Sequence, residues 1–521
     1  MVRTTKQLGG SSECGQSIGD VVEYATTKMT SHYQEWARRL AKDPSSFNQI
    51  EHEVLGFFRL LAGFFMIALL SDVVVRQGIE SAGKGLRAGV KNALRYVRKE
   101  FLQVTLLCGL TIWIQTSYWL PIRAVGPGRR RGIGKRGKEG TGLYPELAVL
   151  GIREGLSSAL QEEIARLAVI MPSFEQALQE LAKRGICLDL KTVARAVLEA
   201  GEQALTARKA DMDAWRRGEL QPGTELHERK VVVSVDGGRV RVRKLRPGRR
   251  TKKRRHRFET PWKEPKLLRI YTVDAAGQRD PDGPQVIDAT MQGPDHVMEL
   301  VAYHLYRLGA QHASELLFLA DGAEWIWDRI PMIAKQIGFD QWLAGNDFCH
   351  TFGYVLCAIN AVGMSDKERK NVSNLCRLAL RDGKTTKVIE RLRNLPDSSC
   401  RDEVQKAIRY IEARTELMKY DVLLAKGLPI GSGAVESAIR RVVNLRVKGP
   451  GMFWKEDNVE GILHLRAALL SGQWGNVFRR VDHYSRTSRE VDWKWESTPY
   501  SCKAKENENE QLVQLVKRVA A

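Results

Sequence analysis

The stretch Val231-Val-Val-Ser-Val-Asp-Gly-Gly238 decides the fold that this sequence predicts. Its first five residues form a short apolar run that is typical of a buried strand, and the run ends at Asp236 followed by glycine. A second apolar run, Glu315-Leu-Leu-Phe-Leu-Ala320, ends in the same way at Asp321-Gly322. A carboxylate at the end of a strand lies at the rim of the sheet, where a following glycine lets a ligand approach the backbone.

The segments around these two runs predict the rest of a sheet. Further strands are expected at 239–243, 267–273, 285–289 and 342–344, and a helix is expected at 294–308. A meander of strands followed by a helix and a parallel-type strand is the order of an RNase H-like fold. The predicted class is therefore α/β, with an RNase H-like core made of a mixed five-stranded sheet with helices.

The domain organisation follows from shifts in composition along the 521 residues, a length that predicts several domains. A helical insertion interrupts the predicted core, and helical regions precede it. The predicted parts are a mostly helical region of unknown role (1–125), a basic glycine-rich linker (126–145), a helical region (146–225), the first part of the core (226–350), the helical insertion (351–428), the last part of the core (429–475) and a C-terminal tail (476–521).

The region 146–225 has the outline of a helix-turn-helix. Ser173 is a plausible N-cap of one helix, Gly185 ends that helix, and a second helix is expected at 190–200. The second helix would offer Lys191, Thr192 and Arg195 to a DNA groove. Any pair of antiparallel helices gives the same pattern, so both interpretations stay open.

Charge favours a polyanionic partner, because the formal net charge is +21. The segment Lys244-Leu-Arg-Pro-Gly-Arg-Arg-Thr-Lys-Lys-Arg-Arg-His-Arg257 holds nine Lys or Arg residues and no acid. Such a run is often only a solvated surface, but its place beside the Asp236 strand favours a DNA clamp. The residues predicted to contact DNA here are Arg249, Arg250, Lys252, Lys253, Arg254 and Arg255.

A second basic segment follows Glu436. Arg440, Arg441, Arg446 and Lys448 are expected to hold a DNA strand. Trp454 could stack on an unpaired base, although a tryptophan more commonly packs in a protein core.

The aspartates indicate metal chemistry, because two like charges side by side are unfavourable unless cations neutralise them. Carboxylate oxygens select Mg²⁺ or Mn²⁺, and a third acid would complete a site for two metal ions. Glu436 is favoured as that acid because Pro429-Ile-Gly-Ser-Gly433 leads into its helix. An ordinary ion pair between Glu436 and Arg440 explains the same pattern equally well. The other acids that could complete the site are Asp288, Glu324 and Asp347.

Several motifs in order resemble those of bacterial insertion-sequence transposases of the ISKra group. They are Val233-Ser-Val-Asp-Gly-Gly238, Leu319-Ala-Asp-Gly-Ala-Glu-Trp-Ile326, Leu428-Pro-Ile-Gly-Ser-Gly-Ala-Val-Glu-Ser437, Lys448-Gly-Pro-Gly-Met-Phe-Trp454 and Leu463-His-Leu-Arg-Ala-Ala-Leu-Leu-Ser-Gly-Gln-Trp474. The resemblance covers about residues 145 to 475. It implies a DDE transposase with an RNase H-like fold that cuts and joins DNA at terminal inverted repeats.

The resemblance also implies roles for individual residues. Asp236, Asp321 and Glu436 would be the catalytic, metal-binding acids, and Asp347-Phe-Cys-His350 resembles an auxiliary Asp-x-x-His motif. His350 could instead be a helix-start histidine satisfied by Asp347. The expected partners are double-stranded DNA and a second copy of the chain on that DNA, with Mg²⁺ or Mn²⁺ and no small-molecule cofactor. Alternatives are an RNase H-like nuclease without strand transfer and a DNA-binding regulator derived from a transposase.

The location expected from the sequence is the bacterial cytoplasm, in association with the nucleoid and without membrane contact. The apolar stretch 60–71 is too short to span a bilayer. The longer stretch 101–122 alternates as strands do, and it ends next to Pro121. The eight cysteines contain no CxxC pair, so neither a zinc site nor a disulfide framework is predicted.

Overall fold

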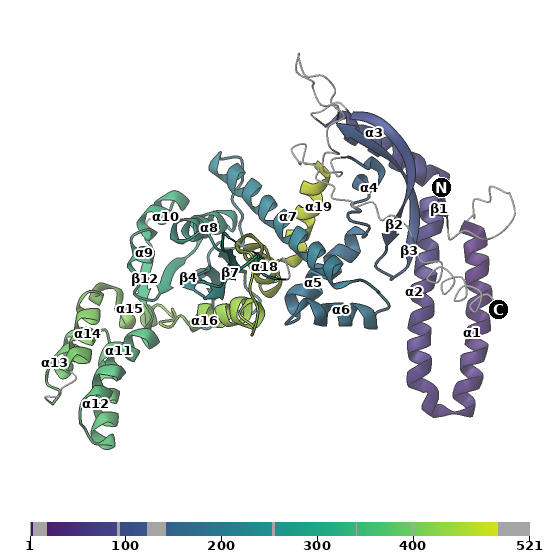
Figure 1. Ribbon diagram of the computed structural model, residues 1–521. Coiled ribbons are helices and arrows are strands. Elements are labelled where there is room, and N and C mark those ends of the chain that lie inside the picture. The colour runs from purple at the N-terminus through teal and green to yellow at the C-terminus, as the bar shows by residue number, and fades with distance from the viewer. Residues whose placement is uncertain are drawn as a thin grey trace, which may run out of the picture. The chain divides into compact units, whose positions relative to one another are not determined.

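The computed structural model describes residues 2–3, 18–90, 94–121, 142–248, 250–252, 256–339, 341–396 and 401–487. The chain divides into two compact units (Figure 1). The first consists of Met1–Ala200 and Arg479–Ala521, and the second is Gly201–Phe478.

The first unit contains a helical hairpin. Helix α1 (Ile18–Lys42) and helix α2 (Phe47–Ser71) are joined by a short 3-10 turn. Arg39 forms an ion pair with Glu53 at 2.7 Å, and the rings of Trp36 and Phe57 meet edge to face with centroids 6.0 Å apart. These contacts hold the two helices side by side near the turn.

Among the described residues, one helix is long and apolar enough to cross a membrane by length and composition, and it comprises Pro44–Ser71. The apolar stretch predicted at 60–71 is therefore part of a longer helix, because helix α2 already begins at Phe47. Large apolar side chains such as Leu55, Phe58 and Leu69 are exposed on this helix. The stretch 101–122 was correctly predicted as strands, since β2 (Leu94–Thr105) and β3 (Thr111–Pro121) form an antiparallel hairpin.

The rest of the first unit is helical. Ser173 caps helix α6 as predicted, because its hydroxyl accepts the backbone N–H of Gln176 at 3.1 Å. Helix α7 (Leu190–Arg216) runs well past the predicted end at residue 200, and it continues into the second unit. The remaining elements of this unit are β1 (Val2–Arg3), α3 (Val73–Ala88), α4 (Pro145–Val149), α5 (Ser158–Ile170), α6 (Phe174–Lys183) and α19 (Trp474–Thr487), which begins in the second unit.

Two of the three residues predicted to enter a DNA groove make contacts within the protein. Thr192 is buried, and its N–H and hydroxyl both donate to Asp189 at the start of α7. Arg195 forms an ion pair with Glu154 at 3.2 Å. Lys191 is exposed.

The second unit is built on a mixed five-stranded sheet with the order β10-β9-β4-β11-β12. Strands β4, β9 and β10 form an antiparallel meander, whereas β11 and β12 run parallel to β4. The predicted strand at 239–243 is wrong in extent, because only Val240–Arg241 form a strand (β5) and this strand lies outside the sheet. The sheet strands are β4 (Lys230–Gly237), β9 (Lys266–Val273), β10 (Gln285–Thr290), β11 (Glu315–Ala320) and β12 (Leu343–Asn346).

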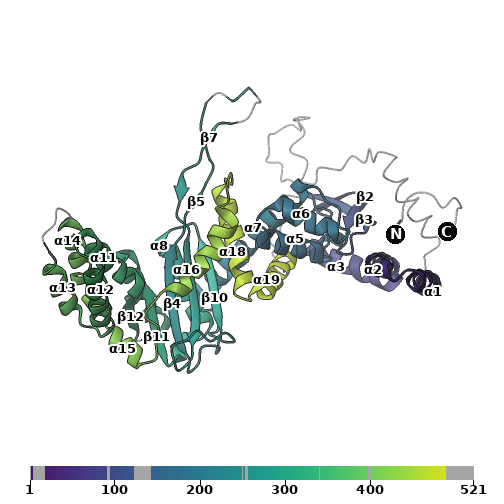
Figure 2. The ribbon, with the colours of Figure 1, turned by 90° about the horizontal axis from the view of Figure 1, so that it is seen from below.

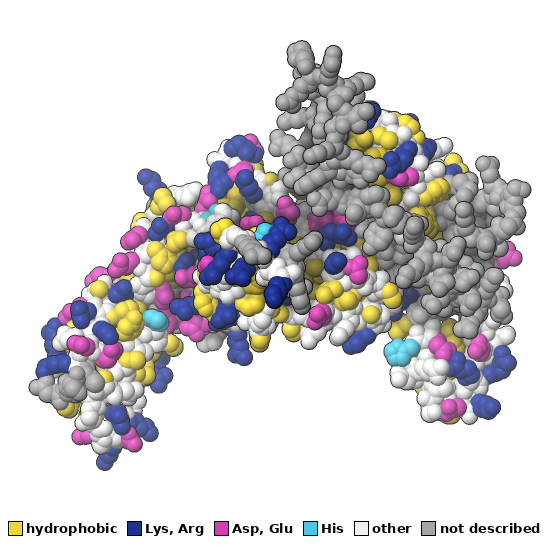
Figure 3. Space-filling view, in the orientation of Figure 1, with side chains coloured by type: hydrophobic (Ala, Val, Ile, Leu, Met, Phe, Trp, Pro, Cys, Tyr) yellow, Lys and Arg dark blue, Asp and Glu magenta, His cyan; other side chains and the backbone are white. Residues whose placement is uncertain are grey.

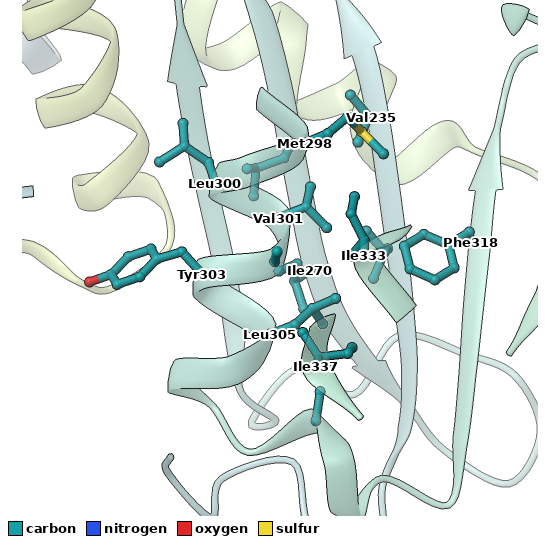
Figure 4. Close-up of a cluster of buried hydrophobic side chains, with 14 of the residues drawn as sticks. Val235, Ile270, Met298, Leu300, Val301, Tyr303, Leu305, Phe318, Ile333 and Ile337 are labelled. Atoms are coloured by element: carbon teal, nitrogen blue, oxygen red, sulfur yellow. The ribbon is translucent and has the colours of Figure 1, made fainter. Parts of the chain in front are cut away.

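Helices cover both faces of this sheet. On one face, α8 (Pro294–Arg307) and α10 (Ile330–Ile337) bury apolar side chains against Val235 and Phe318 (Figure 4). On the other face, Val232 and Leu317 pack against the segment 423–434. Successive side chains of a strand point to opposite faces, so each strand divides its residues between two layers.

The predicted helical insertion is a bundle with its own core, beside β12 (Figures 1 and 2). Leu380, Val388 and Ala407 are fully buried in it. Its helices are α11 (Phe348–Ala361), α12 (Asp366–Arg381), α13 (Thr385–Arg393), α14 (Arg401–Glu412) and α15 (Tyr420–Ala425). The chain then returns to the sheet through α16 (Gly433–Ile439), a π-helical turn (Arg440–Asn444), α17 (Leu445–Val447) and α18 (Glu456–Leu470).

A buried charge network ties four elements of the second unit together. Arg208 of α7 donates to Asp288 of β10 at 2.9 Å and to Glu460 of α18 at 2.6 Å. The ring nitrogens of His304 in α8 and His464 in α18 also form hydrogen bonds with the carboxylate of Asp288, at 3.0 and 2.8 Å. Burial alone would raise the pKa of Asp288, but Arg208 and the histidines outweigh it and hold this pKa well below its usual range. Asp288 is therefore an ionised structural residue.

Replacing Arg208 with methionine should destabilise the second unit strongly, because two buried carboxylates lose their shared cation. We expect the free energy of unfolding to fall by roughly 3–5 kcal/mol, measured by urea denaturation. Arg217→Met is the matched control, since Arg217 pairs with Glu219 on the surface and should change stability little. Equal effects of the two substitutions would contradict the stabilising role of the network.

Candidate active site

The two Asp-Gly motifs lie side by side at one end of the sheet. Phe318 of β11 is the register partner of Val233 in β4, so Asp321 and Asp236 stand at the same level three residues further along both strands. Neighbouring strands are about 4.8 Å apart. The register of β11 with β12 pairs Ala320 with Asn346, which brings Asp347 to the same level. Three acidic positions thus occupy the carboxyl ends of three adjacent parallel strands.

Glu436 approaches from the helix that covers the same face. Alternation along the strands places Asp236 and Asp321 on the face of Val232 and Leu317, against which Ala434 of α16 packs. The π-helical turn after α16 packs closely on the end of β4, because a Cβ at Gly238 would lie 3.1 Å from Val443. The sequence-distant acid is thereby brought to the rim of the sheet.

The charges of Asp321 and Glu436 both act on Asp236. Burial raises the pKa of Asp236, and repulsion from Asp321, Glu436 and Glu264 raises it further. The backbone N–H of Gly237 donates to Asp236 at 2.6 Å and opposes the shift, which leaves a pKa of about 6. Such a raised pKa is typical of carboxylates gathered without enough compensating cations.

The carboxylates do not form a closed ligand set. Among the described residues, no group of three or more His, Cys, Asp or Glu side chains is placed to hold a metal ion. Asp321 instead accepts the backbone N–H of Ala323 at 3.2 Å. Asp236, Asp321 and Glu436 suit Mg²⁺ or Mn²⁺ by donor type and by their uncompensated charge.

The remaining alternatives for the third acid have other surroundings. Asp288 is fixed in the buried network, and Glu324 is exposed at the start of α9 (Glu324–Trp327). The ordinary ion pair considered for Glu436 is not present, because no ion pair of the described residues joins it to Arg440. Glu436 is exposed, and its charge acts on Asp236.

Asp347 and His350 take different places. Asp347 is buried, and its carboxylate accepts the N–H of His350 at the start of α11 and the N–H of Ser432 before α16. It thus joins the end of β12 to the segment that carries Glu436. The exposed His350 imidazole lies beside the rings of Tyr354 and Tyr410, with centroids 5.6 and 6.2 Å away. Asp347 therefore satisfies the backbone of His350, and the imidazole stays exposed to solvent.

The basic segment after β4 forms a two-stranded arm that projects from the end of the sheet (Figure 2). Its short strand pairs are β5 (Val240–Arg241) with β8 (Trp262–Lys263), and β6 (Lys244–Leu245) with β7 (Phe258–Glu259). Arg241 stacks over Trp262 at 4.8 Å and Arg243 over Phe258 at 4.4 Å. Lys and Arg side chains gather around the arm in the space-filling view (Figure 3).

The predicted DNA contacts of the arm are only partly described. Arg250 and Lys252 are exposed near its tip. The other four predicted residues, Arg249, Lys253, Arg254 and Arg255, lie outside the described residues. The arm is anchored at its base, because the backbone N–H of Arg243 donates to the carbonyl of Trp454 at 2.6 Å.

The second basic segment is divided between surface and interior. Arg440 and Lys448 are exposed and Arg441 is half-buried, so these residues could reach a phosphate. Arg446 is only 1% exposed and stacks over Trp454 at 5.2 Å. The Trp454 indole donates to the carbonyl of Val447 at 3.1 Å. Arg446 therefore packs inside the protein instead of facing DNA. Trp454 is half-buried beside it, and its contact with an unpaired base stays a prediction.

Sequence reasoning missed three residues near this end of the sheet. Glu264 acts on the charge of Asp236, and Lys266 binds Glu264 at 2.7 Å. Both residues could be found only from the register of β4 with β9, in which Gly237 pairs with Lys266. The sequence alone does not fix this register. The other missed residue is Arg414 of the insertion, which contacts the loop after Asp321.

No protein-family model matches the chain, and a search of curated proteins finds none that is similar to it.

Replacing Asp236 with asparagine should stabilise the metal-free protein at neutral pH. The folded state raises the pKa of Asp236 from 3.8 to about 6, so between these values it binds more protons than the unfolded chain and loses stability as the pH rises. Asparagine does not ionise, so the variant does not lose this part of the free energy of unfolding as the pH rises. We expect a gain of about 1–2 kcal/mol above pH 6, after allowance for partial exposure, and none below pH 4.

The measurement is urea denaturation across this pH range in the presence of a chelator. Asp366→Asn serves as the control, because Asp366 is 96% exposed on α12 and should give no such pH-dependent difference. An Asp236→Asn protein that is less stable than the wild type at neutral pH would contradict the account of the acid cluster.

Proposed function

We propose that the chain is a DDE transposase that cuts DNA at the terminal inverted repeats of an insertion sequence and joins the ends to new DNA. The observation that carries this proposal is the approach of Asp236, Asp321 and Glu436 to one end and one face of a mixed sheet. In the structural network Arg208 compensates the gathered acids Asp288 and Glu460. No ion pair among the described residues compensates Asp236, Asp321 and Glu436, which favours metal binding over a role in DNA binding alone.

The strand order supports an RNase H-like core. An antiparallel meander (β4, β9, β10) is followed by two strands, β11 and β12, that run parallel to its first strand. The sequence resemblance to ISKra-group transposases assigns catalytic roles to the same three acids. Fold order and motif resemblance thus agree on one site.

Asp236, Asp321 and Glu436 would hold Mg²⁺ or Mn²⁺, with Glu264 close enough to affect them. When bound, the metal would supply activation of a water or 3′-hydroxyl and neutralisation of charge on the phosphodiester. The protein's own part is to keep the acids ionised and aligned at the sheet end. Above pH 6 Asp236 is ionised and available as a ligand.

The arm would bind the DNA duplex beside this site. A two-stranded ribbon fits the major groove. The arginines of the arm that stack on aromatic rings have a fixed position, from which they could bind phosphates. Because Trp454 fixes the base of the arm, DNA bound there would lie at a set place relative to the acids. Two transposon ends require two active sites, so we propose a homodimer on DNA, acting in the bacterial cytoplasm.

Asp236→Ala should reduce cutting of a DNA substrate with the element's inverted repeats to the background rate in Mg²⁺. DNA affinity should stay unchanged or rise, because one negative charge near the phosphates is removed. Gel assays of cutting and of binding measure the two effects, with Asp366→Ala as the control. Strand transfer is scored with pre-cut ends, since a nuclease alone gives no joined product. Cutting by the Asp236→Ala protein at the wild-type rate would contradict the assignment.

The double substitution Arg241→Gln/Arg243→Gln should weaken DNA binding and make it less dependent on salt. The slope of log affinity against log salt concentration should fall by about 0.9 for each phosphate that the arm no longer neutralises, or about 1.8 in total. Fluorescence anisotropy at several salt concentrations measures it. Lys406→Gln/Arg409→Gln on α14 removes the same charge from another exposed surface. An equal change in slope for both double variants would show that only net charge matters.

A further inference from the structure

The helical insertion reaches back to the loop that follows Asp321. Arg414, just beyond α14, donates from Nε and Nη2 to the carbonyl of Gly322 at 3.0 and 2.8 Å. The guanidinium also lies over the ring of Tyr410 at 4.4 Å. A planar fork that donates two hydrogen bonds while it stacks on a ring fixes both the position and the tilt of its acceptor.

The backbone at Gly322 packs too closely on the insertion to admit a side chain. A Cβ at this position would lie 2.4 Å from Nε of Arg414 and 2.6 Å from the hydroxyl of Tyr410. The peptide that follows Asp321 is therefore held against the insertion by close packing as well as by hydrogen bonds. Any rotation of this peptide would move the Asp321 side chain with it.

The same contacts continue to the other acidic segment. The side-chain amide of Asn346 donates to the hydroxyl of Tyr410 at 2.9 Å and to the hydroxyl of Thr351 at 2.7 Å. The next residue, Asp347, accepts the N–H of Ser432 ahead of the Glu436 helix. A continuous path thus runs from Arg414 through Tyr410 and the end of β12 to the start of α16. Its links are ring stacking, hydrogen bonds and the backbone between Asn346 and Asp347.

We propose that Arg414 is a positioning residue that sets the Asp321 carboxylate for metal binding, so that the insertion controls whether the acid site can assemble. This inference rests on the proposed function, in which Asp321 is a metal ligand. Arg414 itself touches only the carbonyl next to that ligand. Residues that orient metal ligands in this way typically change metal affinity by roughly ten- to a hundredfold when they are removed.

The test compares Arg414→Ala and Arg414→Lys with the matched control Arg409→Ala. Arg409 is exposed on α14, the helix that precedes Arg414, and its Nε donates to the carbonyl of Gln405 within that helix. Mn²⁺ affinity is measured by electron paramagnetic resonance, and the half-saturating Mg²⁺ concentration is measured in the cutting assay. We expect Arg414→Ala to weaken Mn²⁺ binding and raise the half-saturating Mg²⁺ roughly tenfold or more, with DNA affinity unchanged. Lysine, which donates to one point, should restore part of the loss.

Unchanged Mn²⁺ affinity in the Arg414→Ala protein would overturn the proposal, and so would an equal loss in Arg409→Ala. If Arg414→Ala fails to fold, Arg414→Lys provides the same test. Lysine cannot donate from two guanidinium nitrogens, so a wild-type metal affinity in this variant would overturn the proposal. A wild-type chain that neither binds Mn²⁺ nor cuts DNA contradicts the proposed function instead. In that case, hydrogen exchange of the peptide 319–328 tests whether Arg414 holds the loop after Asp321. Faster exchange in Arg414→Lys than in Arg409→Ala supports this role, and equal exchange overturns it.

Discussion

Two like charges held one strand spacing apart are the constraint on which this structure depends. The parallel register of β4 and β11 fixes Asp236 and Asp321 at one level, and the fold cannot separate them without breaking the sheet. Burial, reinforced by the repulsion from Asp321 and Glu436, raises the pKa of Asp236 to about 6. The sheet therefore keeps these carboxylates close together although they repel one another. A bound cation would reduce this repulsion.

The arm and the helical insertion both begin at the end of the sheet that carries the acids. The arm follows β4, the strand of Asp236, and the helical insertion follows β12 (Figure 2). Each is tied back to the acidic rim, the arm through Trp454 and the insertion through Arg414. The buried network around Asp288 lies on another strand and serves stability, so one sheet carries acids of two kinds with different roles.

The sequence predicted the parts of this fold that depend on local pattern. Apolar runs ending in Asp-Gly marked β4 and β11 because buried parallel strands need continuous apolar residues. The extent of 239–243 as a strand was predicted wrongly, since alternating Arg and Val residues suit an exposed ribbon as well as a sheet strand. Glu264 and Arg414 could not be found, because their nearness to the acids depends on register and on the return of a distant helix. The choice of Glu436 came from motif resemblance, and its charge does act on Asp236.

The central claim is that Asp236, Asp321 and Glu436 bind one or two metal ions together. The most direct measurement is anomalous X-ray diffraction from crystals of the protein soaked in Mn²⁺. The account predicts Mn²⁺ peaks between these three carboxylates, with metal–oxygen distances of about 2.0–2.3 Å. Mn²⁺ bound only elsewhere, or carboxylates that stay apart at saturating Mn²⁺, would contradict it.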